Sequence, residues 1–599
     1  VLHSTVVVRN GSMTLLTNMI VLALAILVCT SHGKRLHGWR DKMQRHQLAE
    51  HDVSLIAASG SQPLAGVFNN TRTFAMLLLT YDSVAGFHPS VAPLAPAPKI
   101  RPAFPALRLQ FSHSKAIPRV TTLHGAMKGH SAAIVGGGPA GLLTAIMLAR
   151  RGWEQITVYD SLQPPPPPGD PQWGAGERSY QLGLNGRGQA ALRQFGVFER
   201  VESYAASVNG RLSFEKEEGT PTENRFKPPG TPGAERKYVT KVMQRDRLQS
   251  CLLEELSQRY PQVDIKFGVG CDGVDVSGEK PALHLRDPAD ASAAQLSSPV
   301  DLIIGADGVR SAVRESLAEA PGSRTRTVRF EDRNERRYRT LPLHPSAVDG
   351  TASDLNWGLQ NKSKGLGMDA LPTKEGEMVA VLLFKPDSPV SVEIDNLSSG
   401  AEVRKFIADT LPALLPYCRD DDLERFIKRP TSRLPSFQLV EGDIHRSLPH
   451  GGVVLLGDSI KAVKPYFGQG ANSALEDVSI LARCLDSCAE DVSAASAAYS
   501  DARGDDARAL VRTSRSFDMP GPFGTARFLV PLLLDIQLNK LLPSIFSPPM
   551  LRGMQDERNT FVGLRWKKRR ERAVLVALLG AFVASATHLV KLAARLVFA

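Results

Sequence analysis

Three glycines that follow a short apolar run have the types and the spacing to hold a pyrophosphate. Gly136, Gly138 and Gly141 stand in G-x-G-x-x-G order after residues 131–135 and open a segment with helical spacing. In such a turn the first glycine permits the bend, the second lets backbone approach phosphate, and the third lets the helix pack close to the strand. The free N–H groups and the dipole of the helix N-terminus favour negative charge. The pattern therefore predicts a strand, a tight turn and a helix that bind a dinucleotide.

Asp160 is the residue expected to bind the sugar of that dinucleotide. It ends the second apolar run, residues 155–160, about 20 residues after the last glycine, where such folds place an acid. A carboxylate there accepts hydrogen bonds from both hydroxyls of an adenosine ribose. This first region leaves the choice between FAD and NAD open.

Two later apolar runs also end in glycines and acids. Residues 301–304 lead into Gly-Ala-Asp-Gly, which contains Asp307, and residues 453–456 lead into Gly-Asp, which contains Asp458. The Asp458 carboxylate can accept from ribityl hydroxyls. Gly468–Gly470 then opens a helix, whose free N–H groups favour the electron-rich edge of a flavin ring. The three motifs together indicate FAD.

The three motifs, in this order and at these separations, resemble the single-component flavin monooxygenases of the aromatic-hydroxylase family. The resemblance covers residues 131–477. It implies bound FAD, with NADPH and O₂ as co-substrates and a small aromatic molecule as substrate. Within the family, Arg178-Ser179, Arg187-Gly188 and the Pro-Tyr-Phe-Gly-Gln-Gly run at 465–470 are similar to the kynurenine 3-monooxygenases.

The resemblance also implies roles for individual residues. Three of them form the reacting centre: Arg211 would hold a carboxylate of the substrate, and Pro465 and Gly468 would line the flavin ring. Asp307 and Gly308 would also take part in NADPH use. The residues placed along FAD are Gly136, Gly138, Pro139, Ala140, Gly141, Asp160, Arg178, Arg245, Asp307, Gly308, Asp458, Pro465, Gly468, Gln469, Gly470 and Asn472.

The chain departs from the family pattern at three places. Lys461 stands where the family's Gly-Asp-Ala-Ala-His motif has histidine, Pro229 where a tyrosine contacts kynurenine, and Ala507–Arg512 retains only the final arginine of a family motif. These departures leave the substrate open. Two alternatives to a hydroxylase also stay open, namely an FAD-dependent reductase or dehydrogenase of membrane lipids and a catalytically inert flavoprotein.

The expected fold class is α/β, with a Rossmann-like FAD-binding domain interleaved with a β-sheet substrate domain, then C-terminal helices and a membrane anchor. Apolar and alternating runs at 327–343 and 378–385 are expected to supply strands of the sheet that covers the substrate. The expected boundaries are a signal-like or transit-like extension at 1–130, the FAD-binding domain at 131–480 with the substrate domain at about 205–240 and 325–445, a helical region at 481–560, and a basic segment with an anchor at 561–599.

The N-terminal region has the composition of targeting sequence. Leu15–Val28 is apolar and ends in small or polar residues, as in a signal peptide, and Ser83–Trp153 contains no Asp or Glu, as in organelle transit peptides. Together they predict import into a plastid, with mitochondria as the second choice. Because Met127 directly precedes the first motif, the alternative is that residues before it are not part of the mature protein.

The C-terminal end predicts a membrane anchor. Ala573–Val590 is apolar and uncharged, and residues 565–572 before it are rich in Lys and Arg and include Trp566. A basic cluster binds anionic headgroups, and Trp is typical of the membrane interface. A buried terminal helix is the alternative. Phe528–Leu542 is also apolar, but its Pro, Asp and Lys predict an interfacial or substrate-covering helix.

Composition narrows the remaining classes. The net charge is +11, but much of the positive charge lies in the two terminal regions, which favours targeting and membrane contact over nucleic-acid binding. The six cysteines contain no C-x-x-C pair, so a disulfide scaffold is not expected. No metal site is expected, and the oligomeric state stays open.

Overall fold

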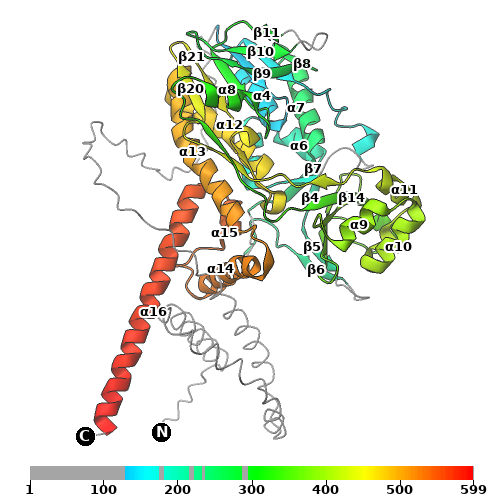
Figure 1. Cartoon of the computed structure of the whole chain (residues 1–599), viewed down its shortest axis with the longest axis vertical. Helices are drawn as coiled ribbons and strands as arrows, with labels where there is room; N and C mark the ends of the chain where they lie inside the picture. Colours follow the sequence, from blue (N-terminus) through cyan, green and yellow to red (C-terminus); the bar gives the residue numbers. More distant parts are fainter. Residues whose placement is uncertain (1–128, 174–180, 215–220, 233–236, 287–293, 598–599) are drawn as a thin grey trace. The chain divides into compact units, whose positions relative to one another are not determined.

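The computed structural model describes residues 129–173, 181–214, 221–232, 237–286 and 294–597 (Figure 1). The chain divides into two units, and most of the described residues belong to the unit formed by residues 96–568. The other unit includes residues 569–599 and is described only for the outer part of one helix. The expectations for residues 1–128 and for Arg178 lie outside the described residues.

A six-stranded sheet carries the three motifs. Its order is β20-β21-β12-β1-β2-β8, and all neighbouring strands are parallel except the pair β20 and β21. The strands are apolar because helices cover the sheet and bury them, as in other parallel sheets; Ile134, for example, is fully buried. The strands are β1 (Ser131–Val135), β2 (Gln155–Asp160), β8 (Val263–Phe267), β12 (Leu302–Gly305), β20 (His445–Leu448) and β21 (Gly451–Leu455).

The helices that follow the first and third motifs pack side by side. α12 lies against α4, α5 and α13 (Figure 1). Since α4 begins directly after β1, this packing brings the glycine turn and loop 465–470 into one region. The helices of this part are α4 (Pro139–Arg150), α5 (Gly186–Gln194), α6 (Phe198–Ser203), α7 (Arg245–Arg259), α8 (Ala312–Glu319), α12 (Gly470–Ser487) and α13 (Val492–Ser516).

A second sheet of seven strands has one apolar and one partly polar face. Its apolar face, with Trp357 and Phe214, packs under α9 (Pro389–Asn396), α10 (Gly400–Thr410) and α11 (Asp420–Lys428) (Figure 1). Because side chains alternate along a strand, the opposite face carries other residues. In sheet order the strands are β18 (Ser432–Arg433), β14 (Arg337–Leu343), β17 (Met378–Phe384), β16 (Leu366–Pro372), β15 (Asn356–Asn361), β5 (Gly210–Phe214) and β6 (Thr222–Arg225).

The sequence predicts that residues 327–343 supply strands of one sheet, but the structure divides them between two sheets. β13 (Arg326–Arg329) pairs with β19 (Gln438–Glu441), whereas β14 belongs to the seven-stranded sheet. The cause is long-range pairing, which local alternation does not encode. The other strands form three-stranded sheets, namely β13-β19-β22 with β22 (Lys461–Ala462), β3-β7-β4 with β3 (Gln181–Leu184), β7 (Thr240–Gln244) and β4 (Ala206–Val208), and β11-β10-β9 with β11 (Ala294–Leu296), β10 (Ala282–Arg286) and β9 (Gly270–Asp275).

The C-terminal part of the chain is helical. α14 (Gly521–Leu541) and the short α15 (Met550–Met554) precede α16 (Phe561–Val597). The basic run and the apolar run lie on this one continuous helix α16. Within it, Phe561–Leu589 contains an 18-residue stretch with a mean hydropathy of 1.7, which by length and composition could cross a membrane.

Candidate functional site

Close backbone contacts explain the first and third glycines of the turn. Gly136 has φ of +103°, and a Cβ there would lie 2.3 Å from the carbonyl oxygen of Ala306, at the end of β12. A Cβ on Gly141 would lie 2.0 Å from the Gly136 carbonyl oxygen. The first and second motifs therefore touch through backbone atoms that leave no room for a side chain.

The N-terminus of α4 is open for an anion. Gly138 is its N-cap residue and Pro139 its first residue, and no side chain caps the helix. Its first N–H groups, around Ala140, are thus free to bind phosphate oxygens. Asp160 lies beside this turn, where it accepts hydrogen bonds from the backbone N–H of Gly137 and Leu162, both at 2.8 Å. Each carboxylate oxygen retains a lone pair for a ribose hydroxyl.

Arg245 connects the glycine turn with the third motif. It is the first residue of α7, and its guanidinium would lie 3.3 Å from a Cβ on Gly138. Asp458 lies near enough for Arg245 to act on its charge. Burial by the surrounding protein raises the pKa of Asp458, and the positive charges of Lys461 and Arg245 partly oppose the shift. The Asp458 side chain nevertheless reaches solvent, so it is accessible to a ligand hydroxyl.

Ser459 joins the second motif to the third. Its hydroxyl donates to Asp307 Oδ1 at 3.1 Å and accepts from the Gly308 N–H at 3.1 Å. The other Asp307 oxygen accepts from the Val313 N–H at 3.2 Å. Ser459 is not among the site residues expected from the sequence. Its polar side chain, next to Asp458 in a buried segment, was the signal available.

The flavin loop, residues 465–470, ends in a second helix N-terminus that no side chain caps. Gly468 has φ of +59°, and α12 starts at Gly470 without a side-chain cap. Gln469 donates from Nε2 to the Phe467 carbonyl at 3.2 Å, whereas its buried Oε1 has no hydrogen-bond partner among the described residues. Pro465 is exposed. An unpaired buried acceptor beside free N–H groups fits a ligand ring that carries both donors and acceptors.

Asn472 holds the flavin loop through a hydrogen bond to the Gly468 carbonyl. Its Oδ1 accepts from the Asn185 N–H at 2.9 Å, and its Nδ2 donates to the carbonyls of Gly183 at 2.7 Å and Gly468 at 2.6 Å. These protein contacts occupy its amide hydrogens. Direct contact of Asn472 with FAD therefore stays a prediction, and the structure gives it a supporting role.

Two buried lysines anchor the two ends of the segment that leads into the flavin loop. Lys464 Nζ lies 2.7 Å from Asp332 and 2.7 Å from Asp518, and it donates to the Asn334 carbonyl at 2.7 Å. Lys461 Nζ lies 2.6 Å from Asp477. From the sequence, Lys461 is only the loss of an imidazole, and Lys464 has no signal because its partners Asp332 and Asp518 lie on distant segments.

Asp477 is the centre of a buried ionic cluster. It accepts from the Gly457 N–H at 2.8 Å, from Lys461, and from Arg503 Nε at 2.5 Å. Burial alone would raise the pKa of Asp477, but Arg503 and Lys461 hold it below its usual value. Because the Gly457 N–H is tied to this carboxylate, the cluster also fixes the backbone at Asp458.

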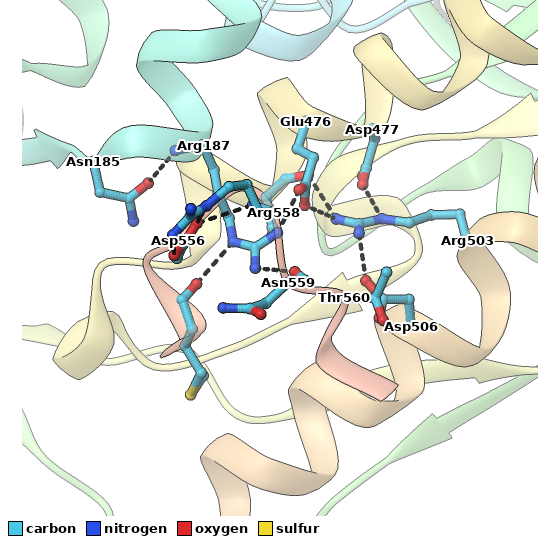
Figure 2. Close-up of polar contacts among 12 residues, drawn as sticks. Asn185, Arg187, Glu476, Asp477, Arg503, Asp506, Asp556, Arg558, Asn559 and Thr560 are labelled. Carbon is cyan, nitrogen blue, oxygen red and sulfur yellow. Dashed lines mark hydrogen bonds and ion pairs between the residues drawn. The ribbon is translucent and has the colours of Figure 1, made fainter. Parts of the chain in front are cut away.

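The cluster continues through arginines to the C-terminal part of the unit, as Figure 2 shows. Arg503 pairs with Asp506 at 2.8 Å and with Glu476 at 3.1 Å. Glu476 also pairs with Arg187, which donates to the carbonyls of Met554, at 2.8 Å, and Asn559. Arg187 therefore ties α5 to residues 554–559.

Arg211 lies on the partly polar face of the second sheet. It is on β5, its guanidinium lies 3.1 Å from Asp369 on β16, and its side chain is 44% exposed. A cavity of about 450 Å³ lies next to this pair. Its lining includes Asp369, Gln360, Arg336, Phe517 and, from the flavin loop, Tyr466. The cavity thus joins the sheet to the flavin loop.

The other two departures from the family pattern, Pro229 and residues 507–512, do not line this cavity. Pro229 is half-buried in the segment after β6 and does not line the cavity. Residues 507–512 are in the middle of α13, where Leu510 and Val511 are buried in the core and Arg512 pairs with Glu441 at 3.3 Å. The cavity residues from this part of the chain are instead Phe517 and Asp518, which the sequence reading did not identify.

We expect Gly141→Ala to destabilise the protein, since the added Cβ would overlap the Gly136 carbonyl oxygen. Overpacking of this kind lowers the free energy of unfolding by about 1–3 kcal/mol. Gly278→Ala is the control, because a Cβ there has its nearest neighbour at 3.5 Å. Chemical denaturation and the FAD content of the purified proteins measure both effects. Equal stability and FAD content in the two variants would contradict the close-approach argument.

We expect Asp477→Asn to lower the free energy of unfolding by about 3–5 kcal/mol, because Lys461 and Arg503 would stay buried without their shared anion. Asp486→Asn is the control on the same helix; Asp486 is exposed and pairs with Arg151. Denaturation curves with and without added FAD measure the change. A shift no larger than that of the control would show that the cluster does not hold the site together.

The residues present fit FAD. A glycine turn without side chains, two open helix N-termini, the reachable Asp458 carboxylate and the unpaired Gln469 oxygen lie along one connected set of contacts. The first motif meets the second through Gly136 and the third through Arg245, and Ser459 joins the second to the third. The site can thus bind an elongated dinucleotide.

Comparisons with known proteins agree with this geometry. A family model described as FAD binding domain matches residues 130–514. The kynurenine 3-monooxygenase of Stenotrophomonas maltophilia (strain K279a) is 32% identical over 427 residues, which cover 70% of this chain and 86% of that enzyme. The kynurenine 3-monooxygenase of Xanthomonas campestris pv. campestris (strain 8004) is 30% identical over 434 residues, covering 70% and 85%.

Among solved structures, 2-methyl-3-hydroxypyridine-5-carboxylic acid oxygenase (mutant C294A) is similar with a TM-score of 0.49 and 19% identity, covering 67% of this chain and 96% of its own. Klebsiella pneumoniae HpxO, complexed with FAD and uric acid, has a TM-score of 0.47 and 17% identity, covering 72% and 97%. By the family model and the curated relatives, the chain belongs to the FAD-binding monooxygenase family of the kynurenine 3-monooxygenases, and it is an FAD-dependent aromatic monooxygenase that uses NADPH and O₂.

Proposed function

We propose that this enzyme hydroxylates a small aromatic acid of the kynurenine class, bound between the second sheet and the flavin loop. The observation that carries the proposal is the cavity of about 450 Å³ shared by Asp369 of the sheet and Tyr466 of the loop, with Arg211 beside it. The curated relatives act on kynurenine by name. A substrate in this cavity would meet both a guanidinium and the flavin loop.

Bound FAD would take electrons from NADPH and activate O₂, which supplies the oxygen atom that is inserted. The chain's own residues bind and orient. Residues 136–141, Asp160 and Arg245 would hold the ADP half of FAD, with Arg178 as a further expected contact. Asp458 would hold the ribityl chain, and Asp307 and Gly308 would contact FAD and take part in NADPH use. Pro465 and Gly468–Gly470 would line the ring, and Tyr466 and Phe517 line the cavity.

Arg211 is proposed to bind the substrate's carboxylate. Its guanidinium forms a planar fork that suits a carboxylate. It can cross β15 because Gly358 lies beneath it, where a Cβ would be 1.9 Å from the guanidinium. Gly358 therefore determines where the charge of Arg211 lies.

The proposed domain layout follows from the order of strands along the chain. The FAD-binding part would span residues 131–480, with the substrate part inserted at about 205–240 and 325–445. Strands β5 and β6 and strands β14 to β18 of one sheet, separated in sequence by strands of the other, support this layout. Helices at 481–560 and a membrane anchor at 561–599 would complete the chain, on a plastid or mitochondrial membrane.

The substrate class is tested by NADPH oxidation with aromatic amino-acid derivatives, including kynurenine, in wild-type protein and in Arg211→Gln. We expect the KM for acidic substrates to rise about 10- to 100-fold in the variant, because a charged hydrogen bond of about 1.5–3 kcal/mol is lost. Arg404→Gln is the control, as Arg404 forms an exposed pair with Asp420. The oxygen of the product should carry ¹⁸O from ¹⁸O₂. Turnover without label would favour the lipid reductase alternative, and tight FAD without turnover the inert flavoprotein.

The anchor is tested by placing charge in the apolar run. Leu579→Arg combined with Phe582→Arg should release the protein from membranes, because each arginine costs about 2.5–3.5 kcal/mol at the centre of a spanning helix. Leu162→Arg, at a leucine that is already exposed in the catalytic unit, is the control. Membrane pelleting and carbonate extraction measure the distribution. If the double variant stays in carbonate-washed membranes, this helix is not the anchor.

A further inference from the structure

Exposed apolar side chains gather on one part of the catalytic unit, namely α14 and the turn directly after it. Elsewhere in the unit such side chains are exposed singly, as at Leu162, Leu296 and Val392. Among the described residues from 519 to 545, the exposed large apolar ones are Met519, Leu529, Val530, Leu533, Leu541, Leu542 and Ile545. Single exposed apolar residues are ordinary on a protein surface, whereas a group of them marks an interaction site.

Four of these residues lie on one side of α14 and define the α14 face, namely Leu529, Val530, Leu533 and Leu541. At 3.6 residues per turn they lie within about 120° of the helix circumference, and Leu533 is 54% exposed. The opposite side of the helix is packed, since Asp535 and Leu538 are buried. α14 therefore turns a second apolar surface toward solvent, in addition to the side that packs against the unit.

The α14 face is not part of the substrate site. Among the described residues, the lining of the cavity of about 450 Å³ includes Phe517 and Asp518 but no residue of α14. Phe528 of α14 packs behind this wall, with its ring centroid 5.4 Å from that of Phe517. Of the two roles that the sequence left open for this helix, the structure thus favours contact with a membrane over covering the substrate.

Positive charge predominates in the same part of the chain. Residues 519–568 contain seven Lys and Arg but three Asp and Glu. Of these acids, Asp535 and Asp556 lie within ion-pair distance of basic side chains, whereas Arg527 and Lys540 of α14 are exposed. An apolar helix face with basic residues beside it fits the surface of a bilayer that contains anionic lipids.

The α14 face is tied to the residues that precede the proposed anchor. Lys568 lies 3.4 Å from Asp535 of α14, and it donates to the Ser547 carbonyl, after the end of α14, at 3.0 Å. Five residues later on the same helix α16, the uncharged apolar run Ala573–Val590 begins. Trp566, two residues before Lys568, is 60% exposed, and tryptophan is typical of the membrane interface. An anchor that enters the bilayer here would hold α14 at the bilayer surface.

We propose that the α14 face is a second membrane contact, which lies in the interfacial layer of an anionic bilayer and does not span it. The catalytic unit would then bind the membrane at two points, the anchor and α14. Alkaline carbonate removes an interfacial contact of this kind but not a spanning helix. This inference rests on the proposed function, since the anchor at 561–599 is what selects lipid as the occupant of the α14 face.

The test removes the anchor first, so that the interfacial contact can be measured alone. Full-length protein that carries Leu579→Arg and Phe582→Arg is floated with vesicles of phosphatidylcholine and phosphatidylserine. Adding Leu529→Ser and Leu533→Ser should weaken vesicle binding about 10- to 100-fold, because two leucines lose their apolar burial in the lipid. Leu162→Ser with Leu296→Ser is the matched control, at two leucines that are exposed elsewhere in the unit. FAD content shows that each variant is folded.

The outcomes separate this contact from the anchor. If the α14 variant binds vesicles as tightly as the control variant, the inference is overturned. Equal binding to vesicles of phosphatidylcholine alone would also contradict it, since the basic residues would then have no role. If sedimentation shows a dimer that the two α14 serines dissociate, a second copy covers the face instead of lipid. If carbonate extracts wild-type protein but vesicle binding depends on Leu529 and Leu533, the proposed anchor fails and this contact stands.

Discussion

The buried carboxylate of Asp477 is the constraint on which the site depends. A buried charge without partners is costly, and removing one partner of such a pair typically costs several kcal/mol. Asp477 meets this requirement with a backbone N–H from the end of β21, a lysine from β22 and an arginine from α13. These three segments are therefore fixed against α12. Asp458 and Ser459 lie between Gly457 and Lys461 in sequence, so their positions are fixed by the same contacts.

The segment that leads into the flavin loop is held by two such buried ionic groups. Lys461 at its start is tied to Asp477, and Lys464 at its end is tied to Asp332 and Asp518. Lysines are strongly hydrated, so their burial is favourable only where several acceptors replace water. Such sites define one position closely. Loop 465–470 can therefore leave Pro465 and Gly468 exposed to a ligand without depending on that ligand for its shape.

The sequence was informative where function depends on backbone geometry and uninformative where it depends on pairing between distant side chains. Gly136 and Gly141 could be identified because only glycine permits these close approaches, and their spacing is local. Ser459 and Lys464 could not, since their partners Asp307, Asp332 and Asp518 are more than fifty residues away. Lys461 was visible as a departure from a motif, but its meaning required Asp477. The split between β13 and β14 also reflects partners that no local pattern specifies.

The two sheets thus solve different problems with different kinds of residue. The six-stranded sheet offers backbone atoms to the cofactor, and buried ion pairs fix those atoms in place. A change in one of the paired side chains therefore disturbs several segments. The seven-stranded sheet presents its partly polar face to the cavity, while its apolar face is packed under α9 to α11. Because alternate residues point to opposite faces, Arg211, Gly358 and Asp369 can differ among relatives without altering the core behind them. Substrate preference can therefore change on this face without disturbing the packing that holds the FAD site.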